Sequence, residues 1–436
     1  MTHFGIISPP VSGHIHPFAA LGRELLSRGH RVTYFQMADL EEKIQSEGID
    51  FRPIGQRDHP RGSLPQSLAQ LGQLKGLAAL RFTIRAVART SVMVCRDAPA
   101  AIRESGVEAL LVDQMEPAGG AVAEHLGLPF ITICNALAIN RDPVAPPPFT
   151  PWSYHDTRWA RLRNQLGYAV SDWLTAPAAR AVADFRASWK LPLLRSLDES
   201  FSKLAQICQM PRDFDFPRAA LPERFHYVGP LRRDSPQPVP FPWDRLDGRP
   251  LVYASLGTLQ NSREPLFRCF AEACQGMDVQ LVMSHGGGLN QQEASSLPGN
   301  PLVVGYAPQL DVLARAALTV THAGLNTVLD SLANSVPLVA VPITYEQPAI
   351  ARRVEWTGSG RSIVLGRLNA RRLREIIRDV LQQGHYRDAA RRIAESIQSA
   401  GGVTQAANIV ETALGKTSHP TSPAASSRQA GLGDTR

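Results

Sequence analysis

A short segment near the amino terminus holds residue types suited to proton transfer. The stretch PPVSGHIHP (Pro9–Pro17) places His14 and His16 directly after an apolar run. Histidine can accept a proton at neutral pH, and a positioned base contributes about 10²–10⁴-fold to a rate. Such a base also needs a carboxylate that fixes its tautomer. Asp113, which ends another apolar run, is the candidate for that partner.

A second group of residues is suited to binding a diphosphate. Gly324 stands between an expected strand, 318–321, and an expected helix, 325–332. A glycine in such a turn lets the backbone approach a ligand closely, and the helix N-terminus favours an anion. A similar turn, SLGT at 255–258, follows the first strand of the same half. Because both turns follow strands of the same half, they predict a single phosphate-binding site at that edge of the sheet.

Side chains on the expected helix extend this site. Asn326 and Thr327 lie on its first turn and can donate hydrogen bonds to phosphate. Asp330 lies about one turn further along, where a carboxylate can accept hydrogen bonds from ribose hydroxyls. The helix is therefore predicted to bind a nucleoside diphosphate.

Apolar strands alternate with amphipathic helices in both halves of the chain, which predicts an α/β fold with parallel, doubly wound sheets. The expected strands are 3–8, 31–36, 49–54, 109–113 and 129–134, then 251–254, 280–283, 302–304, 318–321 and 338–341. The expected organisation is an N-terminal acceptor-binding Rossmann-like domain at 1–230, a Pro-rich linker at 231–249, a C-terminal donor-binding Rossmann-like domain at 250–415 and a disordered tail at 416–436. Ligands of such sheets bind at the carboxyl ends of the strands.

The composition narrows the function classes. The chain has 436 residues, 44% of them hydrophobic and 19% charged, which is typical of a globular protein of two or three domains. Its net charge is +7, but it has no long basic run, so nucleic acid is not an expected partner. Five scattered cysteines argue against a disulfide framework or a zinc site. With no signal peptide, the expected location is the cytoplasm, with peripheral contact to the inner face of the membrane.

The stretch from Tyr306 to Ala349 resembles the donor signature of the inverting UDP-glycosyltransferases, which have the two-domain GT-B fold. The shared pattern is aromatic-x-P-Q, then T-H-x-G-x-N-[ST], an acid three residues later, and [DE]-Q. The resemblance implies that uracil is held near Tyr306, Ala307 and Gln309, and the diphosphate by Ser255, Thr258, His322, Gly324, Asn326 and Thr327. Asp330 would hold the ribose, and Glu346 and Gln347 the sugar hydroxyls.

The resemblance also distinguishes the two histidines. The family's base lies in a G-H-x-x-P pattern, which matches His14 and leaves His16 with a structural role. Its partner is implied to be Asp113. The implied reaction is a single displacement at the anomeric carbon that inverts an α-linked donor into a β-glycoside. No metal ion or other cofactor is expected, because the helix N-terminus can carry the charge of the leaving UDP.

Further blocks outside the donor signature resemble the bacterial zeaxanthin glucosyltransferases. They are HPRGSL (59–64), ARTS (88–91), VDQMEPAG (112–119), NRDP (140–143), DFPRAALPERFHYVGPLR (215–232) and SLGTLQ (255–260). The implied reaction moves glucose from UDP-glucose to the ring hydroxyls of zeaxanthin, giving the mono- and β-diglucoside. Another lipophilic alcohol, a macrolide or a phenol stays an alternative acceptor. A sugar-nucleotide epimerase or a non-catalytic UDP-sugar sensor is the alternative from another class.

One segment is aromatic and basic. Four of the six tryptophans lie between Trp152 and Trp189, among several arginines. Trp159 and Trp173 recur at helical spacing with leucines between them. This pattern predicts a helix at a membrane surface or beside an apolar acceptor pocket, and an ordinary packed helix is the alternative.

Overall fold

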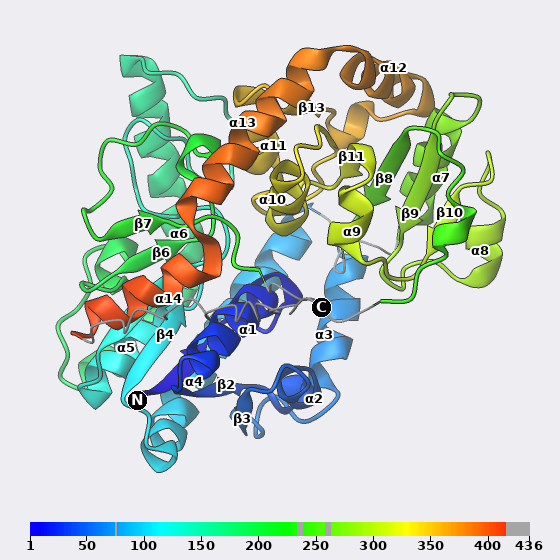
Figure 1. The fold of residues 1–436 in the computed structure, drawn as a ribbon. Helices are drawn as coiled ribbons and strands as arrows, with labels where there is room; N and C mark the ends of the chain where they lie inside the picture. Colours follow the sequence, from blue (N-terminus) through cyan, green and yellow to red (C-terminus); the bar gives the residue numbers. More distant parts are fainter. Residues whose placement is uncertain (75, 233–238, 258–262, 416–436) are drawn as a thin grey trace, which may run out of the picture.

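The computed structural model describes residues 1–74, 76–232, 239–257 and 263–415, and its strands form two parallel sheets (Figure 1). This arrangement confirms the predicted α/β class with two doubly wound sheets. Part of the expected linker (233–238), Thr258 and the expected tail (416–436) lie outside the described residues.

The first sheet has the strand order β3-β2-β1-β4-β5-β6-β7 within the described chain. Its strands are β1 (His3–Ile7), β2 (Arg31–Gln36), β3 (Asp50–Pro53), β4 (Ala109–Asp113), β5 (Phe130–Cys134), β6 (Gln206–Cys208) and β7 (Phe225–Tyr227). The helices of this part are α1 (Ser12–Ser27), α2 (Glu41–Gln45), α3 (Ser63–Gln73), α4 (Gly76–Ser105), α5 (Pro117–Leu126) and α6 (Arg158–Ser188). The central strands β1 and β4 are buried along their whole length because helices cover both faces.

Among the described residues, the second sheet has the strand order β10-β9-β8-β11-β12-β13. Its strands are β8 (Leu251–Ser255), β9 (Gln280–Ser284), β10 (Leu302–Val304), β11 (Ala316–Thr321), β12 (Leu338–Ala340) and β13 (Gly360–Ser362). Its helices are α7 (Glu264–Cys274), α8 (Gln291–Ser295), α9 (Gln309–Leu313), α10 (Leu325–Ala333), α11 (Gln347–Trp356), α12 (Ala370–Gln382) and α13 (Gly384–Ala400), after which α14 (Gly402–Ala413) ends the described chain.

The last helix crosses back to the first sheet. Helix α14 lies beside α1 (Figure 1). Val403 and Val410 of α14 belong to the same apolar core as Leu21 of α1. Arg28 reinforces this contact with an ion pair of 2.7 Å to Glu411. The sequence places 250–415 in the second domain, whereas α14 packs on the first sheet because its apolar face is complementary to α1.

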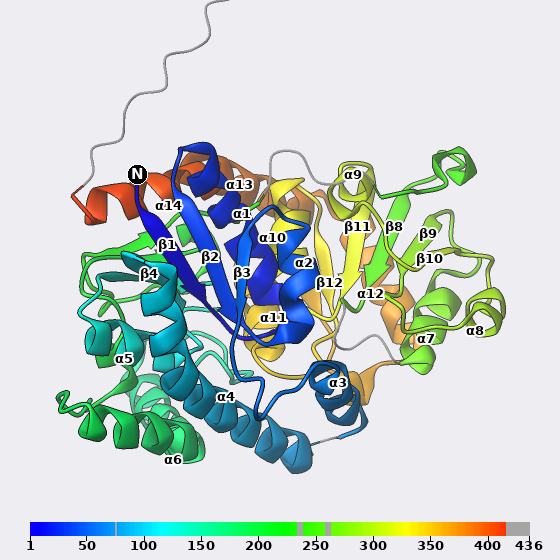
Figure 2. The same ribbon diagram turned by 90° about the horizontal axis from the view of Figure 1, so that it is seen from below.

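Two long helices lie on the outer side of the first sheet. Helices α4 and α6 pack against each other there (Figure 2). The aromatic and basic segment predicted to be helical forms α6, which begins with a cap from Thr157. Among the described residues, no helix combines the length and the hydropathy that crossing a bilayer requires.

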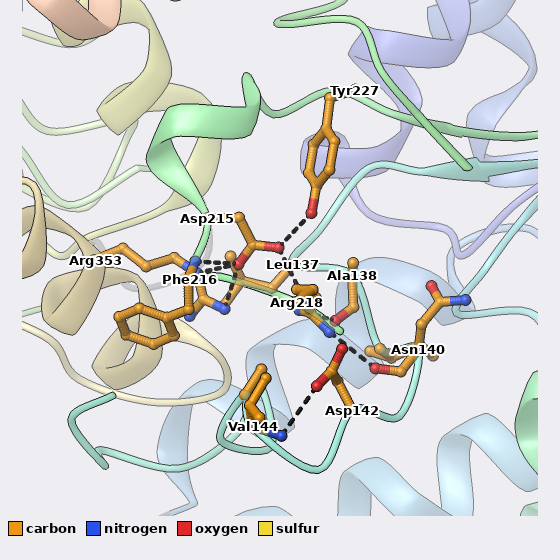
Figure 3. A network of polar contacts seen from close by, with 12 residues as sticks. Leu137, Ala138, Asn140, Asp142, Val144, Asp215, Phe216, Arg218, Tyr227 and Arg353 are labelled. Carbon is orange, nitrogen blue, oxygen red and sulfur yellow. Dashed lines mark hydrogen bonds and ion pairs between the residues drawn. The ribbon is translucent and has the colours of Figure 1, made fainter. Parts of the chain in front are cut away.

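A buried ion pair joins the two halves. Asp215, in the loop after β6, accepts hydrogen bonds of 2.9 and 2.7 Å from Nε and Nη2 of Arg353 in α11 (Figure 3). Its other carboxylate oxygen accepts 2.8 Å bonds from Arg218 and Tyr227. Burial alone would raise the pKa of Asp215, but Arg218 and Arg353 together lower the pKa well below its usual range. The carboxylate is therefore ionised and fully paired.

An apolar cluster surrounds this ion pair. It contains Phe214 and Met210 from the first half and Leu329 and Val354 from the second. The Arg353 guanidinium also lies 4.2 Å from the centre of the Phe216 ring. Because the cluster and the ion pair lie together, the facing edges of the two sheets are held at one relative position.

The ion pair gives a test of this connection. Asp215→Asn is expected to lower the free energy of unfolding by about 3–5 kcal/mol, because two buried guanidinium groups lose their shared carboxylate. Urea denaturation followed by circular dichroism measures the loss. Asp213→Asn, at an exposed position two residues away, is the matched control and is expected to change stability by less than about 0.5 kcal/mol. Equal stability of the two variants would contradict the assignment.

Candidate active site between the two sheets

A cavity of about 1560 Å³ lies between the two halves of the molecule. It is lined by the loops that follow the carboxyl ends of β1, β8, β11 and β12. Parallel sheets bind ligands at this end of their strands. The predicted site residues that line it are His14, Ser255, Tyr306, Ala307, Gln309, His322, Gly324, Asn326, Thr327, Asp330, Glu346 and Gln347. The structure thus brings together residues that are more than 300 positions apart.

His14 and Asp113 meet as predicted. Nδ1 of His14 lies 2.7 Å from Oδ2 of Asp113, whose side chain is fully buried. Asn135 donates to the same oxygen at 2.9 Å, and the Met115 backbone N–H donates to the other oxygen at 2.8 Å. The carboxylate accepts all of these bonds, so Nδ1 of His14 carries the proton. Nε2 is then the nitrogen free to act as a base.

The charges around His14 favour its protonated form. Burial by itself would lower the pKa of His14, but Asp113, with a smaller contribution from Glu346, raises the pKa above its ordinary value. Burial in turn raises the pKa of Glu346, and His14 partly offsets that rise. The imidazolium that forms when His14 accepts a proton is therefore stabilised by a fixed carboxylate, as in hydrolytic triads.

His16 has a different environment. It lines the cavity, but loss of solvation, Lys43 and Arg232 lower its pKa to about 4. A histidine with so low a pKa is neutral near pH 7 and is a weak base. This difference agrees with the predicted choice of His14 over His16, although the catalytic role itself stays a prediction.

The expected phosphate turn is built closely around His322. A Cβ atom at Gly257 or Gly324 would lie 2.8 or 2.6 Å from the nearest His322 ring atom. Gly257 also has a φ of +69°, which favours glycine. Ala323, between His322 and Gly324, has a φ of +65°, a strained backbone of the kind found at functional sites. Burial lowers the pKa of His322 to about 4, so its ring is neutral.

The first turn of α10 connects this phosphate site to the base. Asn326 donates through its amide nitrogen to the carbonyl oxygen of Gly13 at 3.0 Å, and its amide oxygen accepts from Gln209 at 3.1 Å. Gly13 immediately precedes His14. The helix N-terminus expected to bind an anion therefore lies next to the segment expected to supply the base.

The other donor-site residues occupy the second half of the cavity. Tyr306 is 61% exposed and its ring is open to a stacking partner. Gln309 donates to Oδ2 of Asp330 at 2.7 Å, so it supports the residue expected to bind ribose. Gln347 accepts backbone N–H bonds from Ile343 and Thr344 at 2.8 and 2.9 Å, which leaves its amide nitrogen as the donor for a ligand. These residues are brought together, and their binding roles stay predictions.

Sequence reasoning missed two residues of this site. Asn135 follows β5 directly, and its position at the carboxyl end of a strand next to β4 could have identified it. Arg232 forms an ion pair of 2.5 Å with Asp330, and no spacing in the sequence indicates that contact. Across the described residues, no three His, Cys, Asp or Glu side chains group as metal ligands would, and the expected independence of a metal stays a prediction.

Family models match most of the chain. A model described as UDP-glucoronosyl and UDP-glucosyl transferase matches residues 69–398. A second, described as glycosyltransferase family 28 N-terminal domain, matches residues 12–108. Together they span residues 12–398, which include every strand of the two sheets except β1.

Two relatives have similar sequences over nearly their whole length. Proteins named zeaxanthin glucosyltransferase from Pantoea ananas and Pseudescherichia vulneris are 37% and 38% identical to this chain. The alignments cover 95% of this chain in both cases, and 96% and 98% of the two relatives.

Solved structures share the fold at lower sequence identity. A calicheamicin glycosyltransferase aligns with a TM-score of 0.74 at 24% identity and covers 95% of this chain and 98% of its own. A glycotransferase of kitacinnamycin aligns with a TM-score of 0.74 at 23% identity, over 94% of this chain and 99% of its own. These structures confirm the expected GT-B arrangement.

The His14–Asp113 contact gives a second test. The pKa of His14, followed by the NMR shift of its ring Cε1 proton, is expected to lie above 6.5 and to fall in Asp113→Asn, because the neutral amide no longer stabilises the imidazolium. His14→Gln identifies the resonance. Since the raised pKa belongs to the folded state, this contact stabilises the fold fully below the unfolded pKa and loses that contribution as the pH rises through the folded value. An unchanged pKa in Asp113→Asn would contradict the geometry.

Proposed function

The chain belongs to the UDP-glucoronosyl and UDP-glucosyl transferase family, and we propose that it transfers glucose from UDP-glucose to the ring hydroxyls of zeaxanthin. Glycosyl transfer follows from the family. The donor sugar, the acceptor and the products, zeaxanthin mono- and β-diglucoside, are the proposal. The observation that carries it is the 2.7 Å contact between His14 and Asp113, which opens on the same cavity as the phosphate turn.

The proposed reaction is a direct displacement with inversion. Nε2 of His14 takes the proton of the acceptor hydroxyl while its oxygen attacks the anomeric carbon of glucose. The bond from that carbon to the UDP oxygen breaks, and UDP leaves with both electrons of the bond. Asp113 stabilises the imidazolium, and the N-terminus of α10 stabilises the charge of UDP. The proton then returns from His14 to solvent, and the β-glycoside is released.

The acceptor side of the cavity supports a long apolar substrate. Its walls include Leu68 and Leu71 of α3, Phe82 of α4 and Leu174 of α6. Phe149 lines the same space and is 44% exposed, so the apolar lining continues to the solvent. Apolar walls of this kind favour a hydrophobic ligand. The names of the two curated relatives point to the same acceptor class.

The reaction is tested with purified protein, UDP-glucose and detergent-solubilised zeaxanthin. Mass spectrometry is expected to show products heavier by one and then two hexoses, together with released UDP. His14→Ala is expected to lower kcat by about 10²–10⁴-fold because the base is lost. The kcat/KM of the unaltered protein is expected to fall as the pH drops below the raised pKa of His14, since the base is then protonated.

His16→Ala is the matched control for this experiment and is expected to keep most of the activity. UDP release with a macrolide or a phenol, but not with zeaxanthin, would retain the donor assignment and overturn the acceptor. Equal loss of activity in the two histidine variants would overturn the assignment of His14 as the base.

We further propose that the enzyme contacts the membrane surface through α6. One side of this helix carries an apolar stripe open to solvent, formed by Trp159, Leu162, Leu166, Val170 and Trp173, which are 80%, 46%, 60%, 56% and 75% exposed. Their spacing places them within an arc of about 100° on the helix. Tryptophan favours the boundary between water and lipid, where its ring is in apolar surroundings and its N–H is hydrated.

Positive charge near the stripe favours an anionic lipid surface as its partner. The exposed Arg158 and Arg180 lie on the same helix, close to the stripe, and the whole chain carries a net charge of +7. Arginine side chains beside an interfacial helix attract anionic lipid headgroups. Another face of α6, with Leu174 and Ala178, lines the cavity. The same helix therefore borders both the acceptor site and the proposed source of a lipophilic acceptor.

Vesicle flotation tests the membrane contact. The protein is expected to float with vesicles containing about a third phosphatidylglycerol, and Trp159→Ser/Trp173→Ser is expected to lower the bound fraction at least tenfold, because the two largest and most exposed side chains of the stripe are lost. Leu204→Ser/Val364→Ser, at exposed apolar positions outside α6, is the control. Equal flotation of the two double variants would overturn the proposal. A tryptophan-dependent dimer seen by sedimentation, without flotation, would overturn it in favour of a second copy.

A further inference from the structure

Arg232 forms an ion pair with Asp330, the carboxylate expected to bind ribose. Its Nε donates to Oδ1 of Asp330 at 2.5 Å, while Gln309 donates to Oδ2 at 2.7 Å. Both oxygens of Asp330 therefore have protein partners, and its side chain is only 8% exposed. Each oxygen can accept one more hydrogen bond, but the two partners and the surrounding protein cover the carboxylate, so ribose hydroxyls compete with Arg232 and Gln309 for access to it. Arg232 is the more exposed member of the ion pair, at 24%, and has a long, flexible side chain.

The same guanidinium lies along the first turn of α10. Nη2 of Arg232 donates to the backbone oxygen and the side-chain oxygen of Asn326, at 3.2 and 3.3 Å. Nη1 donates to Gln209 at 3.4 Å and to the Leu231 backbone at 3.0 Å. Asn326 and Asp330 are four residues apart, which is about one helical turn or 6 Å. Arg232 therefore spans the distance between the expected ribose and diphosphate positions.

We propose that Arg232 is a positioning residue with two alternating partners, Asp330 in the free enzyme and the diphosphate of the donor in the complex. This inference rests on the proposed UDP-sugar site. When ribose hydroxyls bind Asp330, Arg232 loses an anionic partner at the moment that a diphosphate arrives one turn away. A guanidinium binds phosphate oxygens in a bidentate manner, so the second ion pair replaces the first.

Arg232 and its two partners on α10 belong to different halves of the molecule. Arg232 follows β7 of the first half, whereas Asp330 and Asn326 belong to the second half. Together with burial, the positive charges of Lys43 and Arg232 lower the pKa of His16, which lies in the same segment as His14. In its second position Arg232 would therefore join the bound donor to the half of the molecule that holds His14.

Calorimetric titration with UDP and with uridine tests the proposal. Uridine has the ribose but no phosphate, so it competes with Arg232 for Asp330 without offering Arg232 a new partner. In Arg232→Gln, UDP is expected to bind at least tenfold more weakly and uridine at least as tightly as in the unaltered enzyme. Arg232→Lys is expected to be intermediate for UDP, because lysine keeps the charge without the bidentate geometry.

Arg224→Gln is the matched control, since Arg224 is exposed, lies in the same stretch of chain and is expected to leave both affinities unchanged. Equal weakening of UDP and uridine in Arg232→Gln would show a merely structural role and overturn the proposal, as would unchanged UDP affinity. If the unaltered enzyme bound no UDP, the proposed donor site itself would fail, which is a distinct outcome.

Discussion

The buried contact between Asp215 and Arg353 is the constraint on which the site depends. A shared carboxylate between two guanidinium groups is stable in a dry interior only when every partner is present (Figure 3). The surrounding apolar cluster excludes water and so strengthens these interactions. Arg353 lies in α11, the helix that begins at Gln347 directly after Glu346, so this contact also fixes the side of the cavity expected to hold the sugar relative to the first sheet.

The histidines on the two sides of the cavity have pKa values shifted in opposite directions. On the first side, Asp113 raises the pKa of His14 and prepares it to hold a proton. On the second side, burial keeps His322 neutral within a tight glycine turn, where backbone N–H groups and the dipole of α10 supply the positive potential. The expected base, which gains charge when it takes a proton, therefore faces an expected anion site that needs no charged histidine. This separation suits a reaction in which a proton leaves the acceptor while negative charge develops on UDP.

The proposed membrane contact of α6 would bring a lipophilic acceptor close to the cavity. Two tryptophans on this helix are 80% and 75% exposed, and exposed apolar surface of this extent marks a site of interaction. The cavity behind α6 has apolar walls, so a lipophilic alcohol would pass between similar environments on its way to His14. The polar groups would then be needed only where the hydroxyl reacts.

The sequence by itself determined the alternation of strands and helices, the turn at Gly324 and the candidate pair of His14 and Asp113. The first two follow from periodicity and from backbone freedom at glycine, which are local, whereas the choice of His14 and Asp113 also drew on the resemblance to a known family. Only the tertiary structure decided that Arg232 meets Asp330 and that α14 returns to the first sheet. Such contacts depend on how distant surfaces fit together, and the partners of a surface residue leave no periodic pattern in its own segment.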